Sequence, residues 1–126
     1  MGGSEHPWRK PNPDLVARFH EAVAGIEGVE LRNMFGFPAA FIGGNMTAGV
    51  HPGADTFMVR LAEDERSECL GQGWPPFEPM PGRKMREYVA LPLEVAADIA
   101  ATRHWAERAA AYVRTLPPKA SRGRKR

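Results

Sequence analysis

The spacing of apolar residues predicts a helix near the start of the chain. Four apolar residues recur there at helical spacing: Leu15, Phe19, Val23 and Ile26. The preceding Asn12-Pro13-Asp14 is typical of a helix start, because it combines a capping side chain, a proline in the first turn and an acid near the positive end of the helix dipole. With Gly28 as a natural stop, the pattern predicts a helix over about 13–27.

Between residues 29 and 61 the period shortens to that of strands. Four apolar segments lie at about 30–35, 38–42, 46–51 and 56–61. Gly43-Gly44 suits a tight hairpin turn, because glycine adopts positive φ without a steric penalty. In the last segment the side chains alternate, so that Phe57, Val59 and Leu61 point one way and Thr56, Met58 and Arg60 the other. The short connections exclude a parallel sheet and favour an antiparallel meander.

The second half of the chain predicts two more helices and one more strand. A short helix over 62–70 begins with three acids, which the helix dipole favours. An ordered loop over 72–85 follows, and then a strand over 85–91. The last helix is expected over 93–116, with Arg103 and Glu107 as an ion pair four residues apart. Its predicted buried stripe consists of Val95, Ile99, Thr102, Trp105, Ala109, Tyr112 and Leu116.

These elements predict one α+β domain. Their order is α-β-β-β-(β)-α-β-α, and the economical way to bury the apolar stripes is a two-layer sandwich, with helices packed on one face of an antiparallel sheet of about five strands. The composition is that of a globular protein, with 43% hydrophobic and 25% charged residues. We expect the domain to span 12–118, between a flexible N-terminal arm (1–11) and a disordered basic tail (119–126).

The positive charge of the chain is concentrated in that tail. Five of the 17 basic residues lie in 119–126, where there is no acid, so residues 1–118 carry 12 basic against 15 acidic side chains, a net charge of −3. The tail has no apolar residue other than alanine and cannot fold alone. Such tails attract nucleic acid weakly and without sequence preference, or serve only as solubilising ends. The candidate nucleic-acid residues are Lys119, Arg122, Arg124, Lys125 and Arg126.

The sequence predicts a cytoplasmic protein. No apolar run approaches the roughly 18 residues that span a bilayer, and the first ten residues have no apolar stretch typical of a signal peptide. The single cysteine, Cys69, excludes an internal disulfide. We expect no membrane association.

The residues that usually carry chemistry do not form a recognisable constellation. The four histidines (His6, His20, His51 and His104) show no metal-ligand spacing, so we expect no metal. Cys69 lies among acids, which oppose a nucleophilic thiolate, and is better explained as a small buried residue. The glycines form no phosphate-binding loop, so we expect no nucleotide and no other cofactor. The chain is therefore expected not to be an enzyme.

One loop offers a candidate binding surface. Arg83, Lys84 and Arg86 cluster after a turn, close in sequence to Trp74 and Phe77. This mixture suits the phosphate or acidic groups of a partner. The alternative is a solvated loop whose arginine stems cover the aromatic rings.

Four segments together resemble the TfoX (Sxy) N-terminal domain family. Met34-Phe35-Gly36 resembles the family's hallmark, although Phe37-Pro38 follow it where another glycine is common. The three further segments are 41–50, 57–61 and 77–92, and the resemblance covers about residues 13–118. It implies a secretion-chaperone-like α+β fold and a stand-alone member, because full-length competence regulators carry a second, C-terminal helical domain. Met34, Phe35 and Gly36 are expected to form a strand end with a bend, or else part of a partner-binding patch.

The resemblance also implies a regulatory role. The family's best-known members promote transcription of DNA-uptake genes together with the cAMP receptor protein, whereas many stand-alone members have no assigned activity. We therefore expect a bacterial regulatory or adaptor domain that binds a protein partner. The alternative is a small-molecule-binding domain or minor enzyme that uses a pocket between the sheet and the 74–86 loop. A closed apolar pocket with converging polar groups would favour the alternative, and an exposed apolar patch over a filled core would favour the adaptor.

Overall fold

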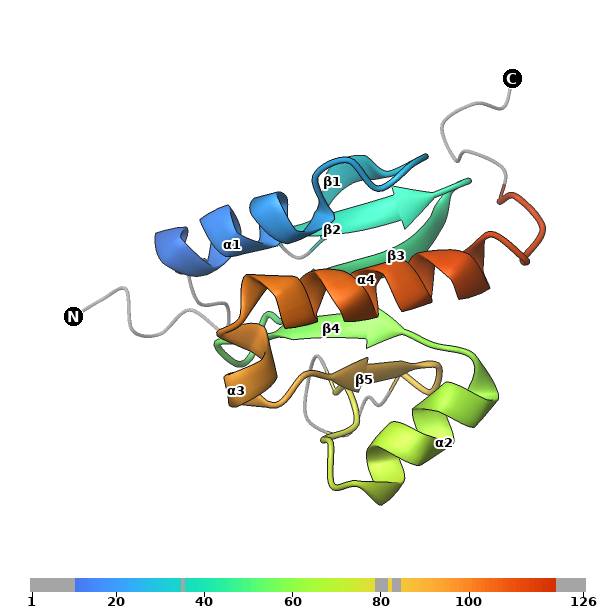
Figure 1. Ribbon diagram of the computed structural model, residues 1–126. Helices are drawn as coiled ribbons and strands as arrows, with labels where there is room; N and C mark the ends of the chain where they lie inside the picture. The colour runs from blue at the N-terminus through green and yellow to red at the C-terminus, as the bar shows by residue number, and fades with distance from the viewer. Residues whose placement is uncertain (1–10, 35, 79–81, 83–84, 120–126) are drawn as a thin grey trace.

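The computed structural model describes residues 11–34, 36–78, 82 and 85–119 of the 126-residue chain (Figure 1). The elements follow in the order α1 (Pro13–Val23), β1 (Glu30–Met34), β2 (Phe37–Ile42), β3 (Asn45–Val50), β4 (Phe57–Arg60), α2 (Glu63–Gly71), β5 (Tyr88–Ala90), α3 (Leu93–Ala96) and α4 (Ile99–Val113). This order confirms the predicted α+β class.

The sheet is a five-stranded antiparallel meander with its strands in chain order. Gly43 and Gly44 form the β2–β3 hairpin turn with φ of 58° and 82°, as their sequence predicts. The connection from β1 to β2 contains Gly36, whose φ is 79°. Left-handed conformations of this kind favour glycine at both turns.

The helices form a second layer over one face of the sheet. Figure 1 shows α1 and α4 side by side in front of the strands, with α2 beside β5. The predicted alternation in β4 is confirmed, because Phe57, Val59 and Leu61 lie in the core under the helices while Met58 belongs to a separate cluster on the other face. The fold is thus a two-layer sandwich, and none of the described helices packs on the other, helix-free face of the sheet.

The predicted boundaries at the helix and strand ends need correction. The single helix expected over 93–116 is wrong: α3 and α4 are separate, and Asp98 caps α4 by accepting bonds from the backbone N–H of Ala100 (2.9 Å) and Ala101 (3.3 Å). Helix α1 ends at Val23 rather than residue 27, ahead of Gly25 with φ of 81°. The last strand is limited to Tyr88–Ala90.

The buried face of α4 is also displaced from the predicted stripe. Its fully buried residues are Thr102, Ala106, Ala109, Ala110 and Val113, whereas Trp105 and Tyr112 are only partly buried. Alanine lets the helix backbone lie close to α1, β3 and β4, so the larger residues pack at the flanks. The predicted pair of Arg103 and Glu107 is present at 3.3 Å.

Candidate binding groove

The helix-free face of the sheet carries its own apolar cluster. It consists of Ala39, Phe41, Met46, Met58, Phe77 and Tyr88, with Met34 and Met85 packed against it. Phe77 comes from the segment that pairs with the edge of β5, and its ring packs against His51 and Tyr88. The cluster is therefore a small second core on this face of the sheet.

A groove of about 500 Å³ is lined in part by residues of this cluster. Its apolar lining consists of three methionines and two aromatic residues: Met34, Met46, Met85, Phe41 and Tyr88. Its polar lining consists of Arg60, Arg86, Glu87 and Lys119. Three cations against one acid give the groove a net positive lining. Methionine side chains are flexible and polarisable, which suits a surface that adapts to a partner.

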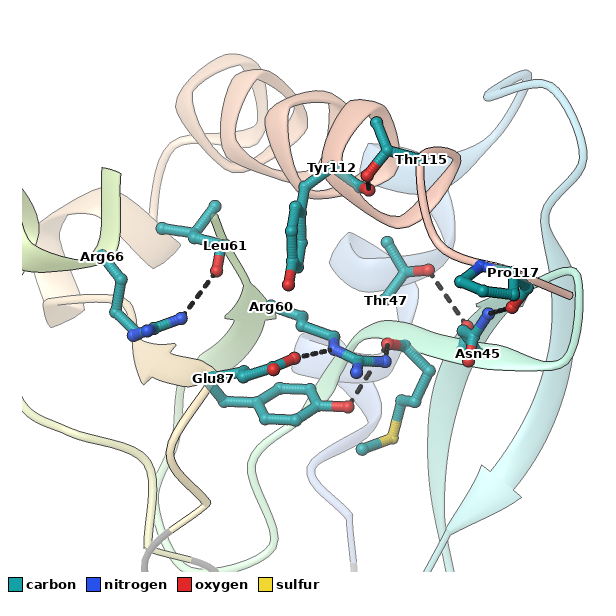
Figure 2. A network of polar contacts seen from close by, with 11 residues as sticks. Asn45, Thr47, Arg60, Leu61, Arg66, Glu87, Tyr112, Thr115 and Pro117 are labelled. Carbon is teal, nitrogen blue, oxygen red and sulfur yellow. Dashed lines mark hydrogen bonds and ion pairs between the residues drawn. The ribbon is translucent and has the colours of Figure 1, made fainter. Parts of the chain in front are cut away.

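Arg60 and Glu87, which both line the groove, form an ion pair. The Arg60 Nε donates to the Glu87 Oε1 at 2.8 Å, and Figure 2 shows the two side chains facing each other. Both the Arg60 Nη1 (3.5 Å) and the Tyr88 hydroxyl (3.3 Å) donate to the Met46 carbonyl. These bonds hold β3, β4 and β5 in register on this face.

The titration of these groups follows from their surroundings. Burial disfavours the charged form of Arg60, but the hydrogen bond to Glu87 and the neighbouring Tyr88 outweigh it and raise the Arg60 pKa above its ordinary value. Burial raises the pKa of Tyr88, against the opposing effect of Arg60. At neutral pH the groove therefore presents a charged guanidinium and a neutral phenol.

The end of the described chain is attached beside the groove. The Lys119 N–H donates to the Gly43 carbonyl at 2.7 Å, and the Asn45 Nδ2 donates to the Pro117 carbonyl at 3.1 Å (Figure 2). A Cβ on Gly44 would lie 2.6 Å from the Lys119 carbonyl oxygen, so only glycine permits this approach. Residues 117–119 are thus attached to the β2–β3 hairpin, and Lys119 is also one of the residues that line the groove.

The structure separates the loop residues that the sequence grouped together. Arg86 is exposed and lines the groove. Phe77 is 1% exposed and packs against His51 and Tyr88. Trp74 lies on the helix side of the sheet, where its ring centroid is 4.9 Å from that of Trp105. Phe77 is therefore a core residue in this fold, and Trp74 does not share a surface with the groove.

Several candidate residues fall outside the described part of the chain. They are Phe35 of the family motif, Arg83 and Lys84 of the loop, and Arg122, Arg124, Lys125 and Arg126 of the tail. Of the family motif, Met34 lines the groove and Gly36 makes the turn with positive φ.

Sequence reasoning did not select Met46, Met85, Arg60 or Glu87 as site residues. One signal was present, because the strand alternation had already placed Met58 and Arg60 on the face away from Phe57 and Val59. The pattern did not show that the described helices leave this face uncovered. Nor did it show that side chains of this face meet a loop and the segment 117–119.

The remaining chemistry-bearing residues lie elsewhere. Cys69 is buried in the helix-side core, and burial together with the negative charge of Glu68 raises its thiol pKa. A second cleft, between α2 and α4, is lined by Glu65 and Glu107, which pair with Arg108 and Arg103 respectively. Within the described residues, no group of three or more His, Cys, Asp or Glu side chains is placed to hold a metal ion.

Comparison with known families decides the relationship. The TfoX N-terminal domain family matches residues 21–112, which is more than half of the chain. The chain belongs to the TfoX N-terminal domain family. No match was found among the curated proteins.

The family match defines which parts of the groove belong to the TfoX N-terminal domain. It extends from α1 into α4, and so includes every groove residue except Lys119. The groove is therefore built from the family domain itself, with its outer rim supplied by the segment that follows. None of the helices in the described ranges is long and apolar enough to cross a membrane.

Proposed function

We propose that this TfoX N-terminal domain is a non-enzymatic regulatory adaptor that binds a protein partner through the groove on the helix-free face of its sheet. The observation that carries the proposal is the groove lining, in which adaptable methionines and aromatic residues lie beside Arg86 and Lys119. An apolar surface rimmed by polar groups is typical of protein-interaction sites. The resemblance to the TfoX regulators supports a partner that acts in transcription.

The charge of the groove favours one kind of partner segment. Arg60 is already paired with Glu87, so Arg86 and Lys119 are the cations left to meet an incoming acid. The expected ligand is a short acidic segment whose apolar side chains enter between the methionines. Complementary charge of this kind mainly raises association rate and specificity, whereas burial at the centre supplies most of the affinity.

The experiment is capture of partners from the native host followed by mass spectrometry, with the intact protein and with Arg86→Glu/Lys119→Glu. We expect the double variant to lose the partner that the intact protein retains. The matched control is Arg114→Glu, which reverses an exposed cation outside the groove. Melting curves establish that all the variants fold. Equal capture by the intact protein and the double variant would contradict the proposal.

A small-molecule ligand is the second candidate, because the groove's volume of about 500 Å³ lies within the range of ligand pockets. Such a ligand would bury itself against Met34, Met46 and Met85 and place an anionic group near Arg86. A thermal-shift screen of anionic metabolites distinguishes the two candidates. A saturable stabilisation that disappears in Met46→Glu would favour the small molecule over the adaptor.

A further inference from the structure

The two edges of the sheet differ in how they are protected. The outer edge of β5 is covered by the segment before it: Pro76 bridges Val89, the Ala90 N–H donates to the Pro75 carbonyl (2.9 Å), and the Phe77 N–H donates to the Tyr88 carbonyl (3.4 Å). The other edge strand is β1, Glu30–Met34, which among the described strands pairs only with β2. Uncovered edges are templates for pairing with another strand.

The side chains of β1 are exposed on both faces. Leu31, on the helix side, is 47% exposed, because α1 packs against α4 and β3 instead of covering β1. Glu30 and Arg32 share the other face, where the Arg32 guanidinium lies 4.8 Å from the centre of the Phe41 ring. The edge thus has space on either side and carries one apolar residue between two opposite charges.

The register of β1 determines which backbone groups point outward. Met34 lies opposite Phe37, with two residues between them, so this pair closes the hairpin as a hydrogen-bonded pair. Alternation then directs the backbone groups of Glu30, Arg32 and Met34 toward β2. Those of Leu31 and Asn33 point away from the sheet, and so does the Val29 carbonyl, while the Val29 N–H donates to Ile26 at 3.3 Å.

We propose that β1 pairs antiparallel with β1 of a second copy of this chain, centred on Leu31, so that two sheets join into one. In this register Leu31 lies opposite Leu31, and Asn33 opposite Val29. The Leu31 N–H and C=O pair with each other across the axis, and each Asn33 N–H donates to the Val29 carbonyl of the other copy. The pairing uses the outward groups without disturbing the β1–β2 ladder.

Charge complementarity selects this register. With Leu31 at the axis, Glu30 of each copy lies directly opposite Arg32 of the other, in non-hydrogen-bonded positions where side chains are close. Centring on Arg32 instead would place two arginines face to face and turn the wrong backbone groups inward. Within one copy the two charges already pair, with 3.1 Å between Arg32 Nη2 and Glu30 Oε1. Self-complementarity of the strand is thus the argument for a second copy over an unrelated strand.

The symmetry has a consequence for the groove. The twofold axis of an antiparallel strand pair is perpendicular to the sheet, so the helices of both copies lie on one side and both grooves on the other. Met34 and Phe41, which line the groove, lie on β1 and on the neighbouring β2. The dimer therefore presents two equivalent grooves on one surface.

The test is sedimentation velocity of the full chain from low to high micromolar concentration. We expect a reversible monomer–dimer equilibrium. Glu30→Arg and Arg32→Glu, each alone, place like charges opposite each other and are expected to weaken the dimer at least tenfold. The combined Glu30→Arg/Arg32→Glu variant restores opposite charges across the axis and is expected to restore dimerisation.

A backbone variant tests the same pairing independently. Leu31→Pro removes an outward N–H, which an edge strand tolerates, and is expected to abolish the dimer, whereas Leu31→Thr keeps the N–H and is expected to retain it. Melting curves verify folding of each variant. A monomer throughout the concentration range would overturn the proposal. So would a dimer that the single charge reversals leave unchanged, since its interface would then lie elsewhere.

Discussion

Gly36 shows how a single residue determines the course of this chain. It lies in the turn from β1 to β2 with φ of 79°, and a Cβ placed on it would meet no atom within 4 Å. The need for glycine here is therefore one of backbone conformation and not of space. The family motif to which Gly36 belongs thus has a structural explanation at this position.

We predict that Gly36→Ala lowers the free energy of unfolding by about 1–2 kcal/mol, the usual cost of a left-handed conformation in a residue with a Cβ. Chemical denaturation with urea measures it. Gly71→Ala is the matched control, because Gly71 ends α2, likewise has open space around it, and does not have positive φ. The control is expected to be neutral or slightly stabilising. Equal effects at the two positions would show that conformation is not the cause.

Cys69 is expected to make the free energy of unfolding depend on pH in the alkaline range. Burial, followed by the charge of Glu68, raises its thiol pKa from 9.0, so the folded state holds the proton more tightly than the unfolded state. This difference contributes fully to the free energy of unfolding below pH 9.0, and the contribution is lost as the pH rises above that value. We predict that stability falls less steeply between pH 8 and 10 in Cys69→Ala than in the original protein. Urea denaturation at each pH measures the free energy of unfolding of the two proteins, and parallel curves of this energy against pH would contradict the prediction. Titration of Tyr88 affects both proteins equally.

At the scale of elements, the break between α3 and α4 depends on one side chain. Asp98 stands between Ala97, the C-cap of α3, and Ile99, the first residue of α4, and its Oδ1 accepts the first free N–H groups of α4. An acid at this position also complements the helix dipole. The apolar periodicity runs across the break, which is why it predicted one helix.

We predict that Asp98→Ala destabilises the domain by about 1 kcal/mol, the typical value of a lost N-cap. Asp98→Asn is the matched control, because it keeps the capping oxygen and loses only the charge. It is expected to lower the free energy of unfolding by a few tenths of the amount lost in Asp98→Ala. Thermal melts followed by circular dichroism measure both. If the alanine and asparagine variants have the same melting temperature, the capping hydrogen bonds of Asp98 do not contribute to stability.

At the scale of the whole molecule, charge is divided between an acidic body and a basic end. Residues 1–118 carry a net charge of −3, whereas the sequence after Lys119 has four cations and no acid. A hydrogen bond from the Lys119 N–H to the Gly43 carbonyl attaches Lys119, the residue before this basic sequence, to the β2–β3 hairpin. Lys119 is therefore the one described residue that belongs to both the nucleic-acid and the partner-binding hypotheses.

We predict that deleting residues 120–126 removes weak duplex DNA binding and leaves the melting temperature nearly unchanged, because Lys119 keeps its bond to the hairpin. If the four cations all neutralise phosphates, log K of the intact protein falls with log salt at a slope of about −3.6. Titration of a random duplex with both proteins at two salt concentrations measures this. Undiminished binding after truncation would move the nucleic-acid surface to the folded domain.

The sequence by itself determined the order of the elements, the Gly43-Gly44 hairpin and the two faces of β4, because these depend on local periodicity and on the backbone freedom of glycine. Only the tertiary structure decided which alanines of α4 lie against the sheet and that Trp74 and Phe77 fall on opposite sides of it. It also brought Met34, Met46, Met85 and Lys119 around one groove. Periodicity says which residues share a face, but the meeting of distant segments depends on strand register and close packing, which no local pattern contains.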